Sequence, residues 1–148
     1  MPRVGIDQTP HILFAEDDDA VAMVVKDLLT DNGYLVTRAM HGREALSMLS
    51  GTSFDLLLTD IRMPYLDGVG LIEEVRQTGS AMPVVVLSGY MTPVARSALD
   101  NLGVRPDAVL EKPCGLPALQ KAIQNGLRSK RSLGMSNRSS FLELRTTS

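Results

Sequence analysis

The sequence predicts a doubly wound α/β domain, in which helices cover both faces of one five-stranded parallel sheet. Five short apolar runs alternate with segments of helical periodicity along residues 11–128, the pattern of repeated strand–helix units. Most of the runs lack the alternation of apolar and polar residues typical of half-exposed strands, as expected for parallel strands covered on both faces. A chain of 148 residues has room for one such domain.

Each predicted strand is a short apolar run. The runs are His11–Ala15, Tyr34–Ala39, Phe54–Thr59, Val84–Ser88 and Ala108–Glu111. Between the first two, apolar residues recur at i, i+3, i+4, i+7 and i+8, which predicts a helix with an apolar stripe made of Val21, Val24, Val25, Leu28 and Leu29. Further helices are predicted at about 42–50, 68–78, 92–102 and 116–128, the fourth with Thr92 as cap and Pro93 as first residue.

Composition excludes several classes of protein. With 44% hydrophobic and 22% charged residues, the chain is not disordered throughout. A single cysteine, Cys114, excludes a disulfide framework and a cysteine-cluster zinc site. No apolar run approaches the roughly 20 residues that span a bilayer, and the N-terminus lacks the apolar region of a signal peptide. We therefore expect a cytoplasmic protein with no membrane partner.

Charge divides the chain into an acidic body and a basic end. Residues 11–127 carry 15 acidic and 9 basic side chains, whereas residues 128–148 carry five basic side chains and Glu143 alone. An acidic body does not favour direct binding of nucleic acid. We predict an N-terminal tail at 1–10, the domain at 11–128, and a disordered basic tail or truncated linker at 129–148. The basic tail is expected to be solvated, and contact with an anionic partner is the alternative.

Polar residues stand at the carboxyl ends of four of the predicted strands. They are Glu16-Asp17-Asp18-Asp19, Asp60, Ser88-Gly89 and Glu111-Lys112-Pro113. In an open α/β sheet, ligands bind beyond the carboxyl ends of the strands, so these side chains should share one cleft. Clustered carboxylates repel one another unless a cation intervenes, and Mg²⁺ suits a partly hydrated site with two carboxylates. A carboxylate nucleophile beside Mg²⁺, a lysine and a hydroxyl is an arrangement for taking up a phosphoryl group.

The chain resembles the receiver domains of bacterial two-component response regulators over roughly residues 11–127. The motifs ILFAEDD, LLLTDIRMPYLDG, VVVLSGY and EKP occur in the order and spacing of that family. The resemblance implies a flavodoxin-like fold with strand order 2-1-3-4-5, cytoplasmic location, and phosphoryl transfer from a histidine kinase or a histidine phosphotransfer protein. It also implies a downstream protein target on the fourth helix, fifth strand and fifth helix. Such a domain catalyses only its own phosphorylation and dephosphorylation.

The resemblance also assigns roles to individual residues. Asp60 would be the phosphoacceptor. Asp17 would ligate Mg²⁺ directly, Glu16 through water, and Arg62 through its backbone carbonyl. Ser88 and Lys112 would contact the phosphoryl group, and the Lys112–Pro113 peptide bond would be cis.

Two features of the sequence qualify this assignment. Asp18 and Asp19 are expected to cap the first helix rather than to bind metal. Val109 stands where many receivers have an aromatic switch residue, so we expect the signal to leave through Gly89 and Tyr90 instead.

Other functions stay open at this point. Asp17-x-Asp19-x-Val21 satisfies the DxDxV signature of haloacid-dehalogenase-type phosphatases, whose nucleophile would be Asp17. A degenerate receiver that serves only as an interaction module is disfavoured by the intact Asp60, Ser88 and Lys112. The chain is either a single-domain regulator or the receiver piece of a hybrid histidine kinase or larger regulator.

Overall fold

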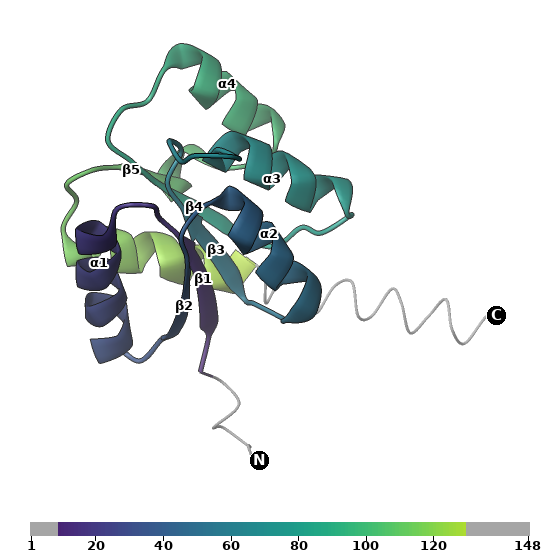
Figure 1. Cartoon of the computed structure of the whole chain (residues 1–148). Helices are drawn as coiled ribbons and strands as arrows, with labels where there is room; N and C mark the ends of the chain where they lie inside the picture. The colour runs from purple at the N-terminus through teal and green to yellow at the C-terminus, as the bar shows by residue number, and fades with distance from the viewer. Residues whose placement is uncertain (1–8, 130–148) are drawn as a thin grey trace, which may run out of the picture.

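The computed structural model describes residues 9–129, so nearly all of the two predicted tails lies outside the described residues (Figure 1). In chain order the elements are β1 (His11–Ala15), α1 (Asp19–Asp31), β2 (Leu35–Ala39), α2 (Gly42–Gly51), β3 (Leu56–Thr59), α3 (Gly68–Gln77), β4 (Val84–Ser88), α4 (Pro93–Asn101), the 3-10 helix η2 (Pro106–Ala108) and β5 (Val109–Glu111). A last helix follows and covers residues 116–129. The alternation of strands and helices is the predicted one.

The sheet has five parallel strands in the order β2-β1-β3-β4-β5. β1 lies between β2 and β3, with Ile12 opposite both Val36 and Leu56. The chain therefore reverses direction across the sheet after β2, and the carboxyl ends of β1 and β3 lie side by side there. This order confirms the predicted doubly wound fold.

Alternate residues of the strands face two separate cores. Leu13 and Ala15 pack on one face with residues of α2, α3 and α4, whereas Ile12 and Phe14 pack on the other with residues of α1 and the last helix. Figure 1 shows the same two layers of helices on either side of the sheet. β1, β3 and β4 are buried almost throughout, which explains why their sequences show no alternation.

Side chains cap the helices where the sequence predicts it. The Asp18 carboxylate accepts hydrogen bonds from the backbone of Ala20 and Val21, and Thr92 caps α4 with Pro93 as its first residue. Each cap gives a partner to an amide that the helix itself leaves without one. The first turn of α1, directly after the first site residues, is thereby held in place.

Three predicted strands begin later in the structure. The Tyr34 amide donates to the Leu29 carbonyl and so completes the end of α1 instead of joining the sheet. Phe54 is buried against the His11 ring but precedes β3, and Ala108 belongs to η2. Local backbone hydrogen bonds therefore shorten strands that hydrophobicity alone extends.

The predicted apolar stripe of α1 is only partly buried. Leu29 is inaccessible, but Val24 is 58% exposed and Leu28 is 38% exposed. An apolar groove runs beside them, with Leu116 and Leu119 of the last helix among its lining residues. Residues of α1 and of the last helix both line this groove, and nothing within residues 9–129 covers Val24 and Leu28 completely.

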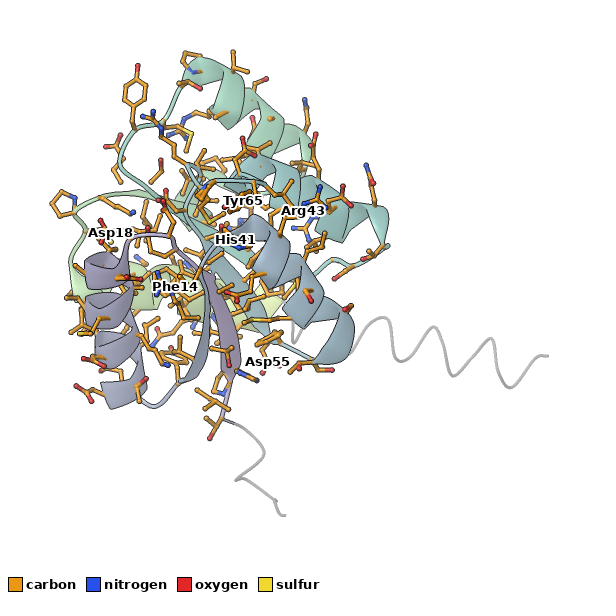
Figure 2. All side chains as sticks on the ribbon, in the orientation of Figure 1. Phe14, Asp18, His41, Arg43, Asp55 and Tyr65 are labelled. Carbon is orange, nitrogen blue, oxygen red and sulfur yellow. The ribbon has the colours of Figure 1, made fainter. Side chains whose placement is uncertain are left out.

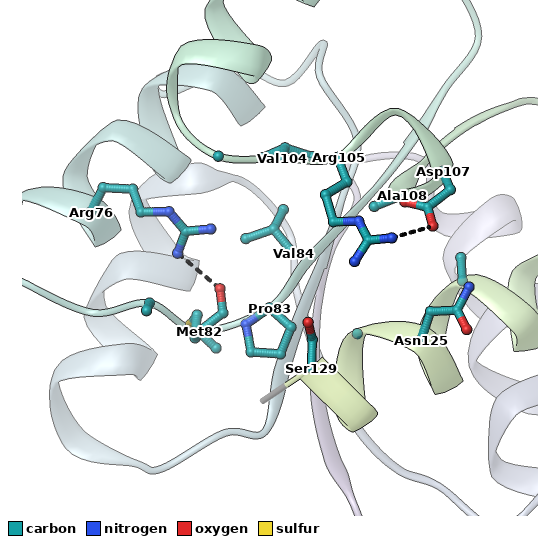
Figure 3. Close-up of a pocket in the computed structure, with 14 residues that line it drawn as sticks. Arg76, Met82, Pro83, Val84, Val104, Arg105, Asp107, Ala108, Asn125 and Ser129 are labelled. Atoms are coloured by element: carbon teal, nitrogen blue, oxygen red, sulfur yellow. Dashed lines mark hydrogen bonds and ion pairs between the residues drawn. The ribbon is translucent and has the colours of Figure 1, made fainter. Parts of the chain in front are cut away.

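A second pocket, of about 120 Å³, lies at the opposite edge of the sheet, where the strands begin (Figure 3). Arg76 lines it and donates hydrogen bonds to the carbonyls of Leu102, Ser80 and Met82. One guanidinium thus joins the ends of α3 and α4 to the segment before β4.

Within residues 9–129, no helix is long and apolar enough to cross a membrane.

Candidate functional site

Four predicted site residues meet where the strands end. Glu16 and Asp17 follow β1, Asp60 follows β3 and Lys112 follows β5. The Lys112 ammonium lies 2.7 Å from Glu16 Oε1 and 3.0 Å from Asp60 Oδ2. Lys112 is 96 positions from Glu16 and 52 positions from Asp60 in the chain, so it is the parallel sheet that brings them together.

Three carboxylates form the acidic part of the site. Glu16, Asp17 and Asp60 each offer an oxygen within 4.8 Å of the others. Glu16 and Asp60 are buried, whereas Asp17 is exposed at the mouth of the cluster. Carboxylate oxygens at this spacing, open to solvent on one side, are the donor set that a partly hydrated Mg²⁺ requires. The residues therefore fit the predicted metal.

Burial and charge shift the pKa values of two of these groups. Burial raises the pKa of the Glu16 carboxyl above its usual value, although hydrogen bonds from Lys112 and Asp18 oppose this. Burial alone would lower the pKa of Lys112, but its hydrogen bonds to Glu16 and Asp60 and their negative charges raise it. Lys112 therefore remains a cation at neutral pH, and one ammonium faces the acidic cluster.

The backbone around Asp60 is tightly packed. Asp60 Oδ1 accepts a hydrogen bond of 2.7 Å from the Ile61 amide, and the Gly68 amide donates to the Ile61 carbonyl. A β-carbon on Gly68 would lie 2.1 Å from the Asp60 carbonyl oxygen, so the start of α3 approaches this strand end as only glycine allows. The carboxylate of Asp60 is held in one orientation as a result.

Ser88 lies at the same edge but its hydroxyl is turned aside. It is 1% exposed, and its Oγ donates to the Tyr90 carbonyl at 3.0 Å and accepts from the Tyr90 amide at 3.3 Å. The Lys112 amide donates to the Ser88 carbonyl at 2.8 Å, but the Ser88 hydroxyl makes no hydrogen bond to the side chain of Asp60 or Lys112 within residues 9–129. To reach a group on Asp60, the hydroxyl would have to leave the backbone of Tyr90.

The other predicted residues surround this core of the site. Arg62 is exposed in the loop after Asp60 and lines a shallow depression with Asp17. The Lys112–Pro113 peptide bond is cis. Val109 is half-buried opposite Val86 of β4.

The loop after β4 carries Gly89 and Tyr90, the predicted exit of the signal. Gly89 does not adopt a positive φ in this structure, and the described glycines that do are Gly33, Gly79 and Gly103. Tyr90 is 63% exposed.

Two residues near the site, Arg38 and His41, had no role assigned to them from the sequence. Arg38, at the end of β2, donates to the Glu16 carbonyl and to Asp19. The His41 ring accepts a hydrogen bond from the Glu44 amide and lies edge-on to Tyr65 in the loop after the predicted acceptor (Figure 2). Both come from the β2–α2 region, where the sequence shows no acidic or nucleophilic cluster. A charged residue in the otherwise uncharged β2 run was the available signal for Arg38.

A family model described as "Response regulator receiver domain" matches residues 12–124. The chain belongs to the response regulator receiver family. The match covers every residue assigned to the site and nearly all of the described domain. This receiver is therefore a signalling domain of two-component systems by family, in agreement with the resemblance that its motifs show.

Curated relatives are similar over the same region. The receiver is 35% identical over 118 residues to "Response regulator MprA" of Mycolicibacterium vanbaalenii, covering 80% of this chain and 50% of the relative. It is 32% identical over 117 residues to "Transcriptional regulatory protein GlrR" of Escherichia coli, covering 79% of this chain and 26% of the relative. The chain thus spans half or less of the length of these relatives.

Solved structures share the fold. The chemotaxis protein CheY4 of Vibrio cholerae matches with a TM-score of 0.74 and 27% identity, covering 80% of this chain and 99% of the other. A receiver domain protein from Methanospirillum hungatei gives 0.79 and 27%, covering 84% and 98%. The signal receiver domain of a signal transduction histidine kinase from Syntrophus aciditrophicus gives 0.72 and 29%, covering 82% and 92%.

Proposed function

We propose that this receiver accepts a phosphoryl group from a phosphohistidine onto Asp60, with Mg²⁺, and changes its affinity for partner proteins. The observation that carries the proposal is the Lys112 ammonium, 2.7 Å from Glu16 and 3.0 Å from Asp60. One cation thus lies against the predicted nucleophile and one of the predicted metal ligands. Asp17 completes the donor set at the open side of the cluster.

In the transfer, an Asp60 carboxylate oxygen attacks phosphorus, the new P–O bond forms, and the P–N bond to the donor imidazole breaks with the electron pair leaving on nitrogen. Asp17, Asp60, the Arg62 carbonyl and, through water, Glu16 would hold Mg²⁺, which would supply positive charge to offset the charge of the phosphoryl oxygens. The Lys112 ammonium shifts from the carboxylates to a phosphoryl oxygen as a charge-assisted donor. Ser88 turns from the Tyr90 backbone to donate a second hydrogen bond.

The donor is a histidine kinase or a histidine phosphotransfer protein, and the state of the domain is read by a protein target at α4, β5 and the last helix. We propose no turnover of an external substrate beyond phosphorylation and dephosphorylation of the domain itself. The alternative is that the chain is the receiver piece of a hybrid histidine kinase or larger regulator. The length of the curated relatives and the likeness to a receiver domain of a histidine kinase support that alternative.

Phosphorylation with a small-molecule donor tests the proposal. The full chain is incubated with acetyl phosphate and MgCl₂, and intact-mass measurement should show one added phosphoryl group that is lost on treatment with hydroxylamine. EDTA should prevent the addition, and Asp60→Asn should abolish it while the circular dichroism spectrum stays unchanged. Asp100→Asn, an exposed aspartate on α4, is the matched control and should be modified like the wild type.

The peptide that carries the label decides between the two aspartyl-phosphate chemistries. Hydroxylamine converts an acyl phosphate to a hydroxamate, which marks the acceptor for peptide mapping. A mark on Asp60 supports a receiver. A mark on Asp17, or full labelling of Asp60→Asn, would show that the chain works as a phosphatase of the haloacid-dehalogenase type.

A further inference from the structure

Arg38 links β2 to the loop that carries two of the predicted metal ligands. Its guanidinium donates from Nε and Nη2 to the Glu16 carbonyl oxygen at 2.9 and 2.7 Å, and from Nη1 to Asp19 Oδ1 at 2.8 Å. The side chain is 19% exposed, so most of it is removed from solvent. One planar group therefore bridges the end of β1 and the first turn of α1, as the fixed donor geometry of arginine permits.

The bonds from Arg38 complete the restraint of the backbone on both sides of Asp17. On the preceding side, the Glu16 amide donates to the Ala39 carbonyl at 3.0 Å, so both backbone groups of Glu16 are bonded to β2. On the following side, the Asp18 carboxylate caps α1 and the Asp18 amide donates to Glu16 Oε2 at 3.2 Å. The Asp17 side chain itself makes no hydrogen bond or ion pair within residues 9–129 and is exposed.

We propose that Arg38 is a positioning residue that presets Asp17 and Glu16 for a divalent cation. This inference rests on the proposed function, because it concerns the affinity of the same site for Mg²⁺. Asp17 has no side-chain partner to orient it before the cation arrives, so its direction is set by the backbone on which it stands. Without Arg38 the Glu16 carbonyl loses both of its side-chain donors, and binding the cation must then order the loop as well.

The sign of the effect separates positioning from simple electrostatics. Arg38 is a positive charge beside a site for a positive ion, so on charge alone its removal should strengthen Mg²⁺ binding. Positioning predicts the opposite, a weaker site. Residues that hold metal ligands in place typically change metal affinity by about 10–100-fold when replaced, and we expect about tenfold because Arg38 acts through the backbone.

The experiment measures Mg²⁺ binding to the full chain by isothermal titration calorimetry for the wild type, Arg38→Gln, Arg38→Lys and Arg43→Gln. Arg38→Lys keeps the charge but has one ammonium, which cannot donate to the Glu16 carbonyl and reach Asp19 in the same way. Arg43→Gln is the charge-matched control, because Arg43 is exposed on α2 and makes no hydrogen bond or ion pair within the described part of the chain. Amide hydrogen exchange of residues 16–19 is followed in EDTA.

We expect dissociation constants about tenfold higher for both Arg38 variants, faster exchange of residues 16–19 in both, and wild-type behaviour for Arg43→Gln. Equal or tighter Mg²⁺ binding by both Arg38 variants, while the wild type binds normally, would overturn the inference and leave the proposed function intact. Failure of the wild type to bind Mg²⁺ would overturn both. If Arg38→Gln does not fold, Arg38→Lys decides the result.

Discussion

Replacing Asp17 by asparagine should stabilise the metal-free protein, even though it removes a predicted metal ligand. The oxygens offered by Asp17, Glu16 and Asp60 lie within 4.8 Å of one another, and Lys112 forms ion pairs with Glu16 and Asp60. Asp17 adds repulsion to this cluster and has no ion pair among residues 9–129. Asparagine keeps its shape and removes the repulsion, whereas the same change at Asp60 would also remove an attraction to Lys112.

The size of the effect follows from the separation of the charges. Two unit charges 4.8 Å apart repel by about 3.5 kcal/mol at an effective dielectric constant of about 20. Asp17 is exposed, so solvent screens both of its repulsions, and we reduce their sum to about 1 kcal/mol. In a domain of this size that gain corresponds to a rise of about 3–5 °C in Tm. For the wild type, Mg²⁺ at ten times its Kd should add about 1.4 kcal/mol, a gain that Asp17→Asn should largely lose.

Thermal unfolding followed by circular dichroism, in EDTA and then in MgCl₂, measures both effects. Asp27→Asn is the control, because Asp27 is an exposed aspartate of α1 that lies outside the cluster. The control should match the wild type in EDTA and should gain the same stability from Mg²⁺. An Asp17→Asn protein that is less stable than the wild type in EDTA, or that gains as much from Mg²⁺, would refute the assignment of Asp17 to a strained metal-binding cluster.

Two further predictions concern the transmission of the phosphorylated state. Ser88→Ala should weaken the coupling between phosphorylation and conformation by at most about 1.5–3 kcal/mol, the usual value of a hydrogen bond to a charged group, and Lys112→Ala should weaken it more. Partner binding by the phosphorylated variants measures the coupling, and wild-type affinities would show that neither residue transmits the signal. Residues 88–102 should exchange amide hydrogens rapidly without a phosphate mimic and only partly slow down with beryllofluoride. Protection of this segment in both states, with the largest change at Val109, would contradict that prediction.

Most of the fold could be predicted because its cause is local in the sequence. Val84–Leu87 is apolar throughout, and the structure buries these four residues, together with Ser88 at the strand end, because helices cover both faces of the sheet. Caps such as Asp18 depend on a few neighbouring residues and were equally predictable. The exposure of part of the α1 stripe could not be predicted from the sequence, because Val24 and Leu28 have the same local pattern as Leu29 but no neighbour that covers them.

The site residues also divide into those that a local sequence pattern places and those that it does not. Glu16, Asp60 and Lys112 each follow a strand, so the rule that ligands bind at the carboxyl ends of parallel strands is enough to place them together. Arg38 could not be placed in this way, because a single arginine within a strand does not reveal which carbonyl its side chain will reach. Its partner is the backbone carbonyl oxygen of Glu16. Every residue has such an oxygen, so the sequence does not indicate that Arg38 bonds to this one.

The contacts of Ser88 indicate why the response of the domain to phosphorylation should be graded. The hydroxyl already makes two hydrogen bonds with the Tyr90 backbone, so a new bond to a phosphoryl group replaces contacts rather than adding to them. Val109, half-buried on β5 and stiff at its single χ angle, cannot swing as an aromatic residue would. Shifting a two-state equilibrium from 1:99 to 99:1 needs about 5.5 kcal/mol, more than one exchanged hydrogen bond supplies. Leu99 is the one buried residue of α4, so this helix has few contacts that would resist a partial shift.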